Sequence, residues 1–184
     1  VVGWAVFTEP TKPLIQHRSG FLTKKLRPNR GFMKKITPNL WFDGNAQEAV
    51  DFYVSVFPDS KITSVMHYPK SAEEGLADFQ LDLAGKPLVV EFELSGNHFV
   101  AINAGPEFKF TEAVSFSIPC KDQEEIDYYW EKLSAVPEAE QCGWCKDQYS
   151  LSWQVVPENM AELMKRPNAY AKMMQMKKLV ISEF

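Results

Sequence analysis

Cysteine is scarce in this sequence, which excludes a fold held together by a disulfide framework. The chain of 184 residues has three cysteines, Cys120, Cys142 and Cys145, a number that is both small and odd. Small secreted domains depend on several paired cysteines, whereas reducing compartments keep thiols free. We therefore predict a cytoplasmic protein.

Long apolar runs are missing as well, and none approaches the roughly 18 residues that would span a bilayer. We therefore predict no membrane partner. Basic residues gather in residues 1–32, which hold six Lys or Arg and a single acidic residue, although the whole chain has a net charge of −4. The remainder is thus strongly acidic, which argues against a nucleic-acid partner.

Residues 1–32 also lack a helical or strand period and contain three prolines. We interpret them as a basic irregular extension, either a targeting or anionic-surface arm or a segment that is not part of the native protein. The second reading is favoured because no signal-peptide core is present. Met33 is followed directly by a strand-like run, so residues 33–184 are predicted to form the domain.

The domain contains the same order of elements twice. Strand-like runs at residues 36–42 and 113–118 precede Asn45 and Asp122, which are predicted helix N-caps with a glutamate three residues later in both cases. Apolar residues at helical spacing follow each cap. We predict two related modules.

The apolar pattern switches to a period of two after each predicted helix, which is typical of strands. Predicted strands occupy residues 61–67, 88–94, 98–103 and 150–156. Residues 76–84 also alternate, and the pattern leaves open whether they form a strand or an ordered loop.

Helical spacing returns at the end of the chain. Pro157 is predicted in the first turn of one helix, and residues 168–178 in a second. The domain therefore divides into module one at about 35–104, module two at about 112–157 and a C-terminal helical tail at 158–180.

Several stretches of the sequence carry a family resemblance. They are residues 40–53 (LWFDGNAQEAVDFY), 113–116 (AVSF), 123–133 (QEEIDYYWEKL), and a signature made of 141–144 (QCGW), Asp147 and 152–157 (SWQVVP). These stretches resemble the PhnB-like proteins, which are often labelled 3-demethylubiquinone-9 3-methyltransferase. That family is a branch of the vicinal oxygen chelate superfamily of glyoxalases, bleomycin resistance proteins and dioxygenases.

The resemblance implies an α+β fold in which paired βαβββ modules form a cupped mixed sheet, and it implies a homodimer. A cupped sheet provides a concave pocket, so the expected partner is a small molecule. Methyl transfer is not predicted, because the sequence has no strand followed by a Gly-rich turn suited to a nucleoside-bearing methyl donor.

Metal-dependent relatives place four ligands on the first and last strands of the two modules. The corresponding positions here are Asn39, Asn103, Ser115 and Gln154. Amides and hydroxyls lack the charge or basicity of the usual carboxylate and imidazole ligands, so we predict no catalytic metal or other cofactor.

Two alternatives stay open. A divalent-metal site at positions other than those of the relatives could use His67, Glu91 and His98. The protein would then be a metal-dependent lyase, isomerase or dioxygenase. Cys142 and Cys145 have the C-x-x-C spacing of thiol oxidoreductases. A structural role is the favoured reading, with Cys145 as a small apolar residue in a loop that enters a strand.

Polar and aromatic residues on the predicted strands are the candidates for a ligand pocket. They are Asn39, Trp41, Asn103, Ser115, Ser117, Ser152 and Gln154. Hydrogen bonding between strands would account for the same residues without a ligand. The leading hypothesis is a small-molecule-binding protein of unassigned activity that works without a catalytic metal.

Overall fold

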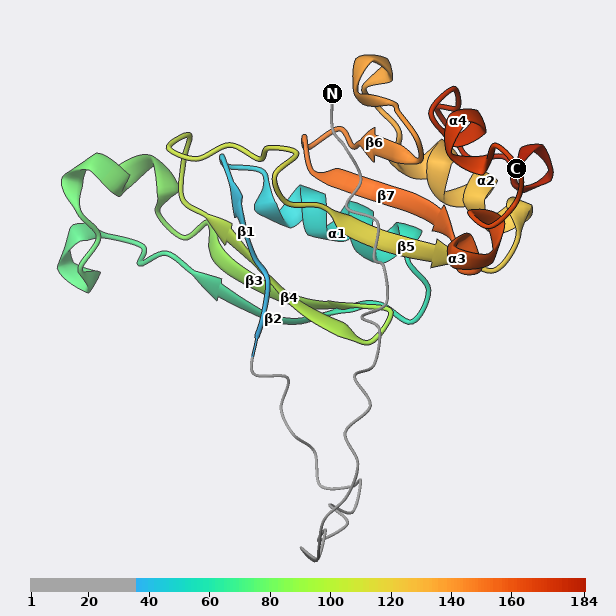
Figure 1. Cartoon of the computed structure of the whole chain (residues 1–184). Helices are drawn as coiled ribbons and strands as arrows, with labels where there is room; N and C mark the ends of the chain where they lie inside the picture. Colours follow the sequence, from blue (N-terminus) through green and yellow to red (C-terminus); the bar gives the residue numbers. More distant parts are fainter. Residues whose placement is uncertain (1–35) are drawn as a thin grey trace, which may run out of the picture. The chain divides into compact units, whose positions relative to one another are not determined.

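Two sheets, each with a helix of its own, make up the part of the chain that the computed structural model describes, residues 36–184 (Figure 1). The predicted basic extension at residues 1–32 lies outside the described residues. The α+β class and the repeated order of elements are confirmed, since both sheets begin with a strand that is followed by a helix.

The first module is a complete βαβββ unit. Its sheet has the order β1-β4-β3-β2, in which β1 runs parallel to β4 and the other neighbours are antiparallel. The elements are β1 (Asn39–Phe42), α1 (Ala46–Val56), β2 (Lys61–His67), β3 (Pro87–Leu94) and β4 (Asn97–Asn103).

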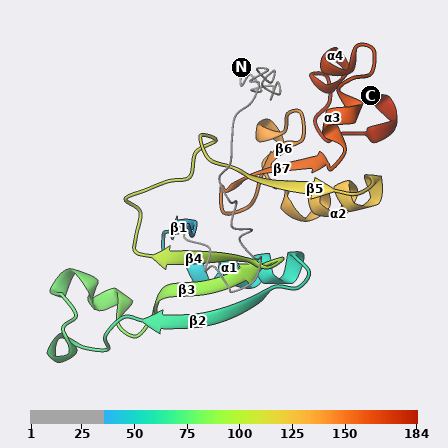
Figure 2. The ribbon, with the colours of Figure 1, turned by 60° about the horizontal axis from the view of Figure 1, so that its bottom comes forward.

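The second module has three strands in the order β5-β7-β6, with β5 parallel to β7 (Figure 2). Its elements are β5 (Phe116–Cys120), α2 (Gln123–Leu133), the 3-10 turn η3 (Pro137–Ala139), β6 (Trp144–Lys146) and β7 (Ser152–Pro157).

A fourth strand in the second module would follow α2. Between α2 and η3, the chain makes one backbone hydrogen bond to a strand of the sheet, from Ala135 N to Lys146 O at 2.9 Å. Pro137 then starts η3, and proline has no N–H with which to continue a ladder. The second module is therefore βαββ instead of the expected βαβββ.

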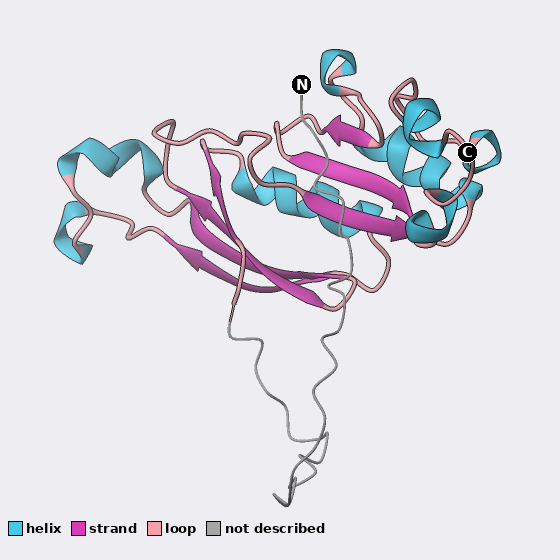
Figure 3. Ribbon diagram, in the orientation of Figure 1, coloured by secondary structure: helices cyan, strands magenta, loops and turns pink. Residues whose placement is uncertain are grey.

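Short helical segments fill the remaining connections (Figure 3). The undecided residues 76–84 contain the 3-10 helix η2 (Asp78–Leu83), which follows another, η1 (Ala72–Glu74). The tail is helical but in short pieces: α3 (Met160–Leu163), α4 (Ala169–Met173) and η4 (Ile181–Glu183). None of the helices between residues 36 and 184 has the length and apolar character needed to cross a membrane.

Pro157 does not start a helix, and that prediction is wrong. It is the last residue of β7, where it pairs with Cys120 in the parallel register. Proline is tolerated here because β6 pairs only with residues 152–154, so at Pro157 the strand has a neighbour on one side only.

The two helices begin in different ways. Asp122 caps α2 as predicted, since its Oδ1 accepts a hydrogen bond from Glu125 N at 2.9 Å while Glu125 bonds back to Lys121 N. Asn45 makes no side-chain cap bond. The N-terminus of α1 is bonded instead by Asn103, whose Oδ1 accepts from Ala46 N at 3.2 Å.

Aromatic side chains join the two modules. Phe57, at the end of α1, has its ring centroid 5.2 Å from that of Tyr129 on α2 and 5.3 Å from that of Trp153 on β7. Phe99 of β4 meets Phe116 of β5 at 5.2 Å. The modules therefore share one core on the sides of the sheets that their helices cover.

A buried carboxylate lies within that core. Asp147 is 1% exposed and accepts four hydrogen bonds. Oδ2 accepts from Tyr53 Oη at 2.8 Å and Trp153 Nε1 at 2.7 Å, and Oδ1 accepts from the backbone N–H groups of Tyr149 at 2.8 Å and Leu151 at 3.0 Å. Burial raises the pKa of Asp147, and the bonds from Trp153 and Tyr53 oppose the rise.

Tyr53→Phe is expected to destabilise the protein by about 1–3 kcal/mol, because it removes one donor from a buried carboxylate and keeps the ring. The measurement is the free energy of unfolding from urea titration. Tyr170→Phe is the matched control: Tyr170 is exposed, so its loss is expected to cost less than about 0.5 kcal/mol. Equal stability of the two variants would contradict the role assigned to Asp147.

Candidate functional site

The four-stranded sheet has two chemically different faces. One face packs on α1. Its side chains are buried along β1, β3 and β4, for example at Leu40, Val90, Phe92 and Ala101. We call the opposite face the outer face of the first sheet. By strand register it carries Asn39, Trp41, Met66, Val89, Glu91, Glu93, His98, Val100 and Ile102.

Trp41 is the anchored aromatic residue of this face. Its Nε1 donates a hydrogen bond to Gly105 O at 2.8 Å, and its ring meets Phe108 edge-on with centroids 4.9 Å apart. In strand register it stands beside Ile102, which in turn pairs with Val89. Asn39 lies on the same face, is exposed, and donates to Thr37 O. The two predicted residues of β1 are thus brought together on a partly apolar surface.

Asn103 lies on the other face. It pairs with Phe42 in register, is 3% exposed, and uses both ends of its amide within the protein. Oδ1 accepts from Ala46 N, and Nδ2 donates to Pro87 O at 2.9 Å. Asn103 therefore orders the start of α1 and does not line the outer face with Asn39 and Trp41.

The other four predicted pocket residues share the outer face of the second sheet, the face turned away from α2. Ser117 pairs with Gln154 in register, and Gln154 Nε2 donates to Ser115 Oγ at 2.7 Å. Ser152 points to the same side as Gln154 by strand alternation. Its hydroxyl is buried, with the residue 1% exposed, and finds no hydrogen-bond partner among residues 36–184.

The residues of the alternative metal site are not gathered. His98 stands opposite Glu93 across β3 and β4, with Glu91 further along the same face, whereas His67 pairs with Pro87 at the far end of β2. Between residues 36 and 184, no group of three or more His, Cys, Asp or Glu side chains is placed to hold a metal ion.

Both cysteines of the C-x-x-C pair are buried. Cys145 lies in the core opposite Trp153 in register, and burial raises its pKa to about 12, with Asp147 adding to the rise. Cys142 is also buried, with its Sγ 3.2 Å from Gln141 Nε2 and 3.6 Å from Met174 Sδ. A redox pair needs a stabilised, accessible thiolate, so this geometry favours structural roles.

Sequence reasoning missed the role of Asp147, although the residue was visible in the family signature. Its main partner from the first module, Tyr53, is 94 positions away and looked like one more apolar residue on a helix stripe. A charged residue among Trp, Tyr and Leu was the available signal, because such a residue is rarely buried without partners.

Comparisons with known proteins agree with the geometry. The sequence model of the family 3-demethylubiquinone-9 3-methyltransferase matches residues 34–156. A PhnB protein from Bacillus cereus is 32% identical over 67% of this chain and 99% of its own, with a TM-score of 0.54. A Pseudomonas aeruginosa protein, 18% identical over 67% of this chain and 96% of its own with a TM-score of 0.51, shares the fold. No curated protein is significantly similar.

Cys120 and Cys145 are expected to resist alkylation in the native protein, because burial raises the pKa of each thiol to about 12. Below that pH, the thiolate fraction and hence the iodoacetamide rate should rise about tenfold per pH unit. Mass spectrometry of labelled peptides measures the rates, and urea-unfolded protein is the control. An apparent pKa near 7 at Cys142 or Cys145 would reinstate the redox alternative.

Proposed function

Because the chain belongs to the 3-demethylubiquinone-9 3-methyltransferase family, the PhnB-like branch of the vicinal oxygen chelate superfamily, we propose that it binds a small molecule as a homodimer without a catalytic metal. Membership gives the fold and leaves the activity unassigned. The observation that carries the proposal is the outer face of the first sheet, where a fixed tryptophan stands among half-buried aliphatic residues and a few polar groups.

A sheet face with apolar residues of this kind is usually covered by a ligand or by another chain. Val89, Val100 and Ile102 are half-buried and Met66 is 54% exposed, while α1 packs on the opposite face. Contiguous exposed apolar surface usually marks a ligand or partner site. Pockets for small molecules are mostly apolar with a few orienting polar groups, which Asn39, together with Trp41, supplies here.

A second copy of the chain provides the other wall in this proposal. A small-molecule site buries most of its ligand, and one sheet face alone is too open to do so. The outer face of the second sheet offers Ser115, Ser117 and Gln154. Twofold dimers are the commonest assemblies, and one would set the first sheet of each chain against the second sheet of its partner.

The metal-free part rests on the chemistry of the side chains. Asn39, Ser115 and Gln154 are neutral, and divalent catalytic sites use imidazole, thiolate or carboxylate ligands. One alternative is a divalent-metal-dependent lyase, isomerase or dioxygenase. It would use His98 and Glu93, which pair across β3 and β4 but are not part of a group of three metal-ligating residues within residues 36–184.

A screen of small molecules in metal-free buffer should yield compounds that raise the melting temperature of the wild-type protein. At a concentration of 100 times Kd, a ligand stabilises by about 2.7 kcal/mol, a shift of several degrees for a domain of this size. Trp41→Leu should abolish the shift by removing the aromatic wall. Phe79→Leu, an aromatic change at an exposed position of η2, should preserve it.

The same screen tests the metal alternative. Compounds that act only after Zn²⁺, Ni²⁺ or Fe²⁺ is added, with one ion bound per chain and both effects lost in His98→Ala, would replace the metal-free proposal. Retention of the shift in Trp41→Leu would remove the outer face of the first sheet as the site.

Ile102→Glu is expected to convert the dimer into a monomer, because it places a charge among apolar residues at the proposed interface. Light scattering after gel filtration should give about twice the chain mass of 21.0 kDa for the wild type and the chain mass for the variant. Phe79→Glu, the same kind of change far out on η2, should stay dimeric. A monomeric wild type would refute the dimer.

A further inference from the structure

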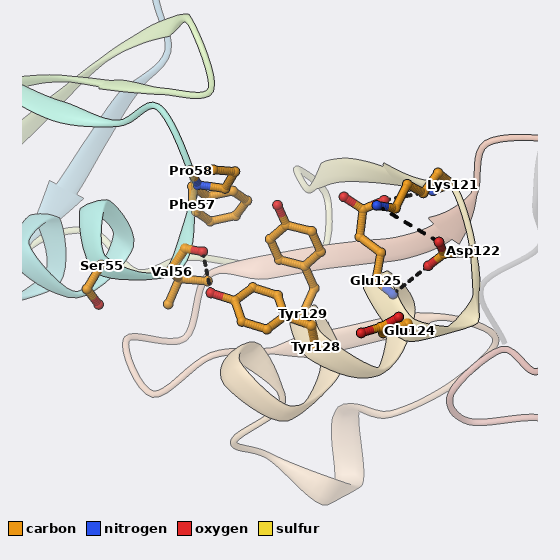
Figure 4. Close-up of a pocket in the computed structure, with 10 residues that line it drawn as sticks. All are labelled: Ser55, Val56, Phe57, Pro58, Lys121, Asp122, Glu124, Glu125, Tyr128 and Tyr129. Carbon is orange, nitrogen blue, oxygen red and sulfur yellow. Dashed lines mark hydrogen bonds and ion pairs between the residues drawn. The ribbon is translucent and has the colours of Figure 1, made fainter.

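A hollow between the C-terminal end of α1 and the start of α2 is lined by polar side chains that bond within the protein (Figure 4). Tyr128 Oη donates to Val56 O at 2.8 Å, and Asp122 Oδ1 accepts from Glu125 N at 2.9 Å. The first bond joins α2 to α1 and the second caps α2, so neither needs a ligand.

The outer face of the second sheet carries a charged side chain, Lys146 of β6. Lys146 stands opposite Ser152 in the register of β6 and β7, next to the pair Trp144 and Gln154. Its side chain is only 18% exposed, and its Nζ forms an ion pair with Glu112. Lysine is rarely covered to this degree without a partner, so the ammonium group is held on the sheet face and not extended into solvent.

The polar groups around Lys146 leave hydrogen-bond donors unused. An ammonium group carries three N–H donors, and Glu112 is the one partner of this group among residues 36–184. Directly across the strand pair, the buried hydroxyl of Ser152 also finds no partner in that part of the chain. Ser115 Oγ accepts from Gln154 Nε2, so its own O–H can still donate. Donors in excess of acceptors favour a ligand group with anionic oxygens.

Glu112 is a partner that such a group can replace. It lies in the segment between β4 and β5, and its side chain is 54% exposed. Within residues 36–184, residues 106–114 of this segment form one backbone-to-backbone hydrogen bond, from Val114 N to Thr111 O at 3.4 Å. Exposed ion pairs stabilise a protein little, so a second carboxylate can take the place of the first.

We propose that Lys146 binds a carboxylate of the ligand, and that Glu112 occupies the same ammonium group in the free protein. This inference rests on the proposed function, in which the outer faces form the ligand site. Lys146 is the one charged residue on the strands of the second sheet, in a chain of net charge −4, which favours a single negative charge over a dianion. The facing wall carries Trp41 and aliphatic residues, so the rest of the ligand is apolar or aromatic.

3-Phenylpropionate is the probe, and 3-phenylpropanamide, which has the same shape without the charge, is its control. Titration of the ¹⁵N-labelled full chain at constant pH and ionic strength should show the acid shifting the amide signals of residues 144–146 and 152–154. The acid should bind about tenfold more tightly than the amide, because a hydrogen bond between charged groups contributes more than a neutral one. No binding of the acid, or equal binding of both compounds, would overturn the proposal.

Lys146→Met should remove the preference for the acid and leave the affinity for the amide unchanged. Glu112→Gln should strengthen binding of the acid about two- to fivefold, because it removes the competing carboxylate. Glu107→Gln is the matched control: it changes the net charge equally in the same segment, whereas Lys146 pairs with Glu112. Equal effects of the two glutamate variants, or a preference for the acid that persists in Lys146→Met, would overturn the proposal.

Trp41→Leu separates this proposal from the proposed function. It should weaken the acid and the amide alike, because both would lose the aromatic wall. A compound that depends on Trp41 and binds Lys146→Met as well as it binds the wild type would leave the outer-face site standing and would refute the role of Lys146.

Discussion

The fold depends on one buried carboxylate. Asp147 is held by a tyrosine from the helix of the first module, a tryptophan from the last strand of the second, and two backbone N–H groups of its own loop. A carboxylate in this position is tolerated only while its donors stay in place, because an unpaired buried charge is very costly. The interaction therefore links the two modules through their core, beside the aromatic contacts of Phe57 and Phe99.

That constraint decides which surfaces are available for function. The helix-covered sides of both sheets are buried in the shared core. The polar and aromatic residues that face away from the helices are therefore the ones that can contact a ligand or a second chain. Trp41 and Asn39 stand on one such face, and Ser117 with Gln154 on the other.

The repeat, the fold class and the family could be predicted because they depend on local signals: strand periodicity, caps and helical stripes. The capping box at Asp122 is local, and its prediction is confirmed. The predicted cap at Asn45 is wrong, because the amide of Ala46 is bonded instead by Asn103, which is 57 positions away. The prediction that Asn103 lines the pocket is wrong because of another non-local effect. Alternation of residues along a strand separates its two faces, but it does not tell which face a distant helix will cover. The missing fourth strand of the second module followed from Pro137, a local signal that the expected symmetry of the repeat obscured.

We propose that the outer faces of the two sheets form a metal-free ligand site that a second chain completes. A crystal structure of the protein with the most stabilising compound from the screen tests it most directly. We expect electron density for the compound against Trp41 of one protomer, with the second sheet of the partner closing over it and no ion within reach of His98. An ion held by His98 and a glutamate of β3, or a compound bound elsewhere on a monomer, would refute the metal-free dimeric site.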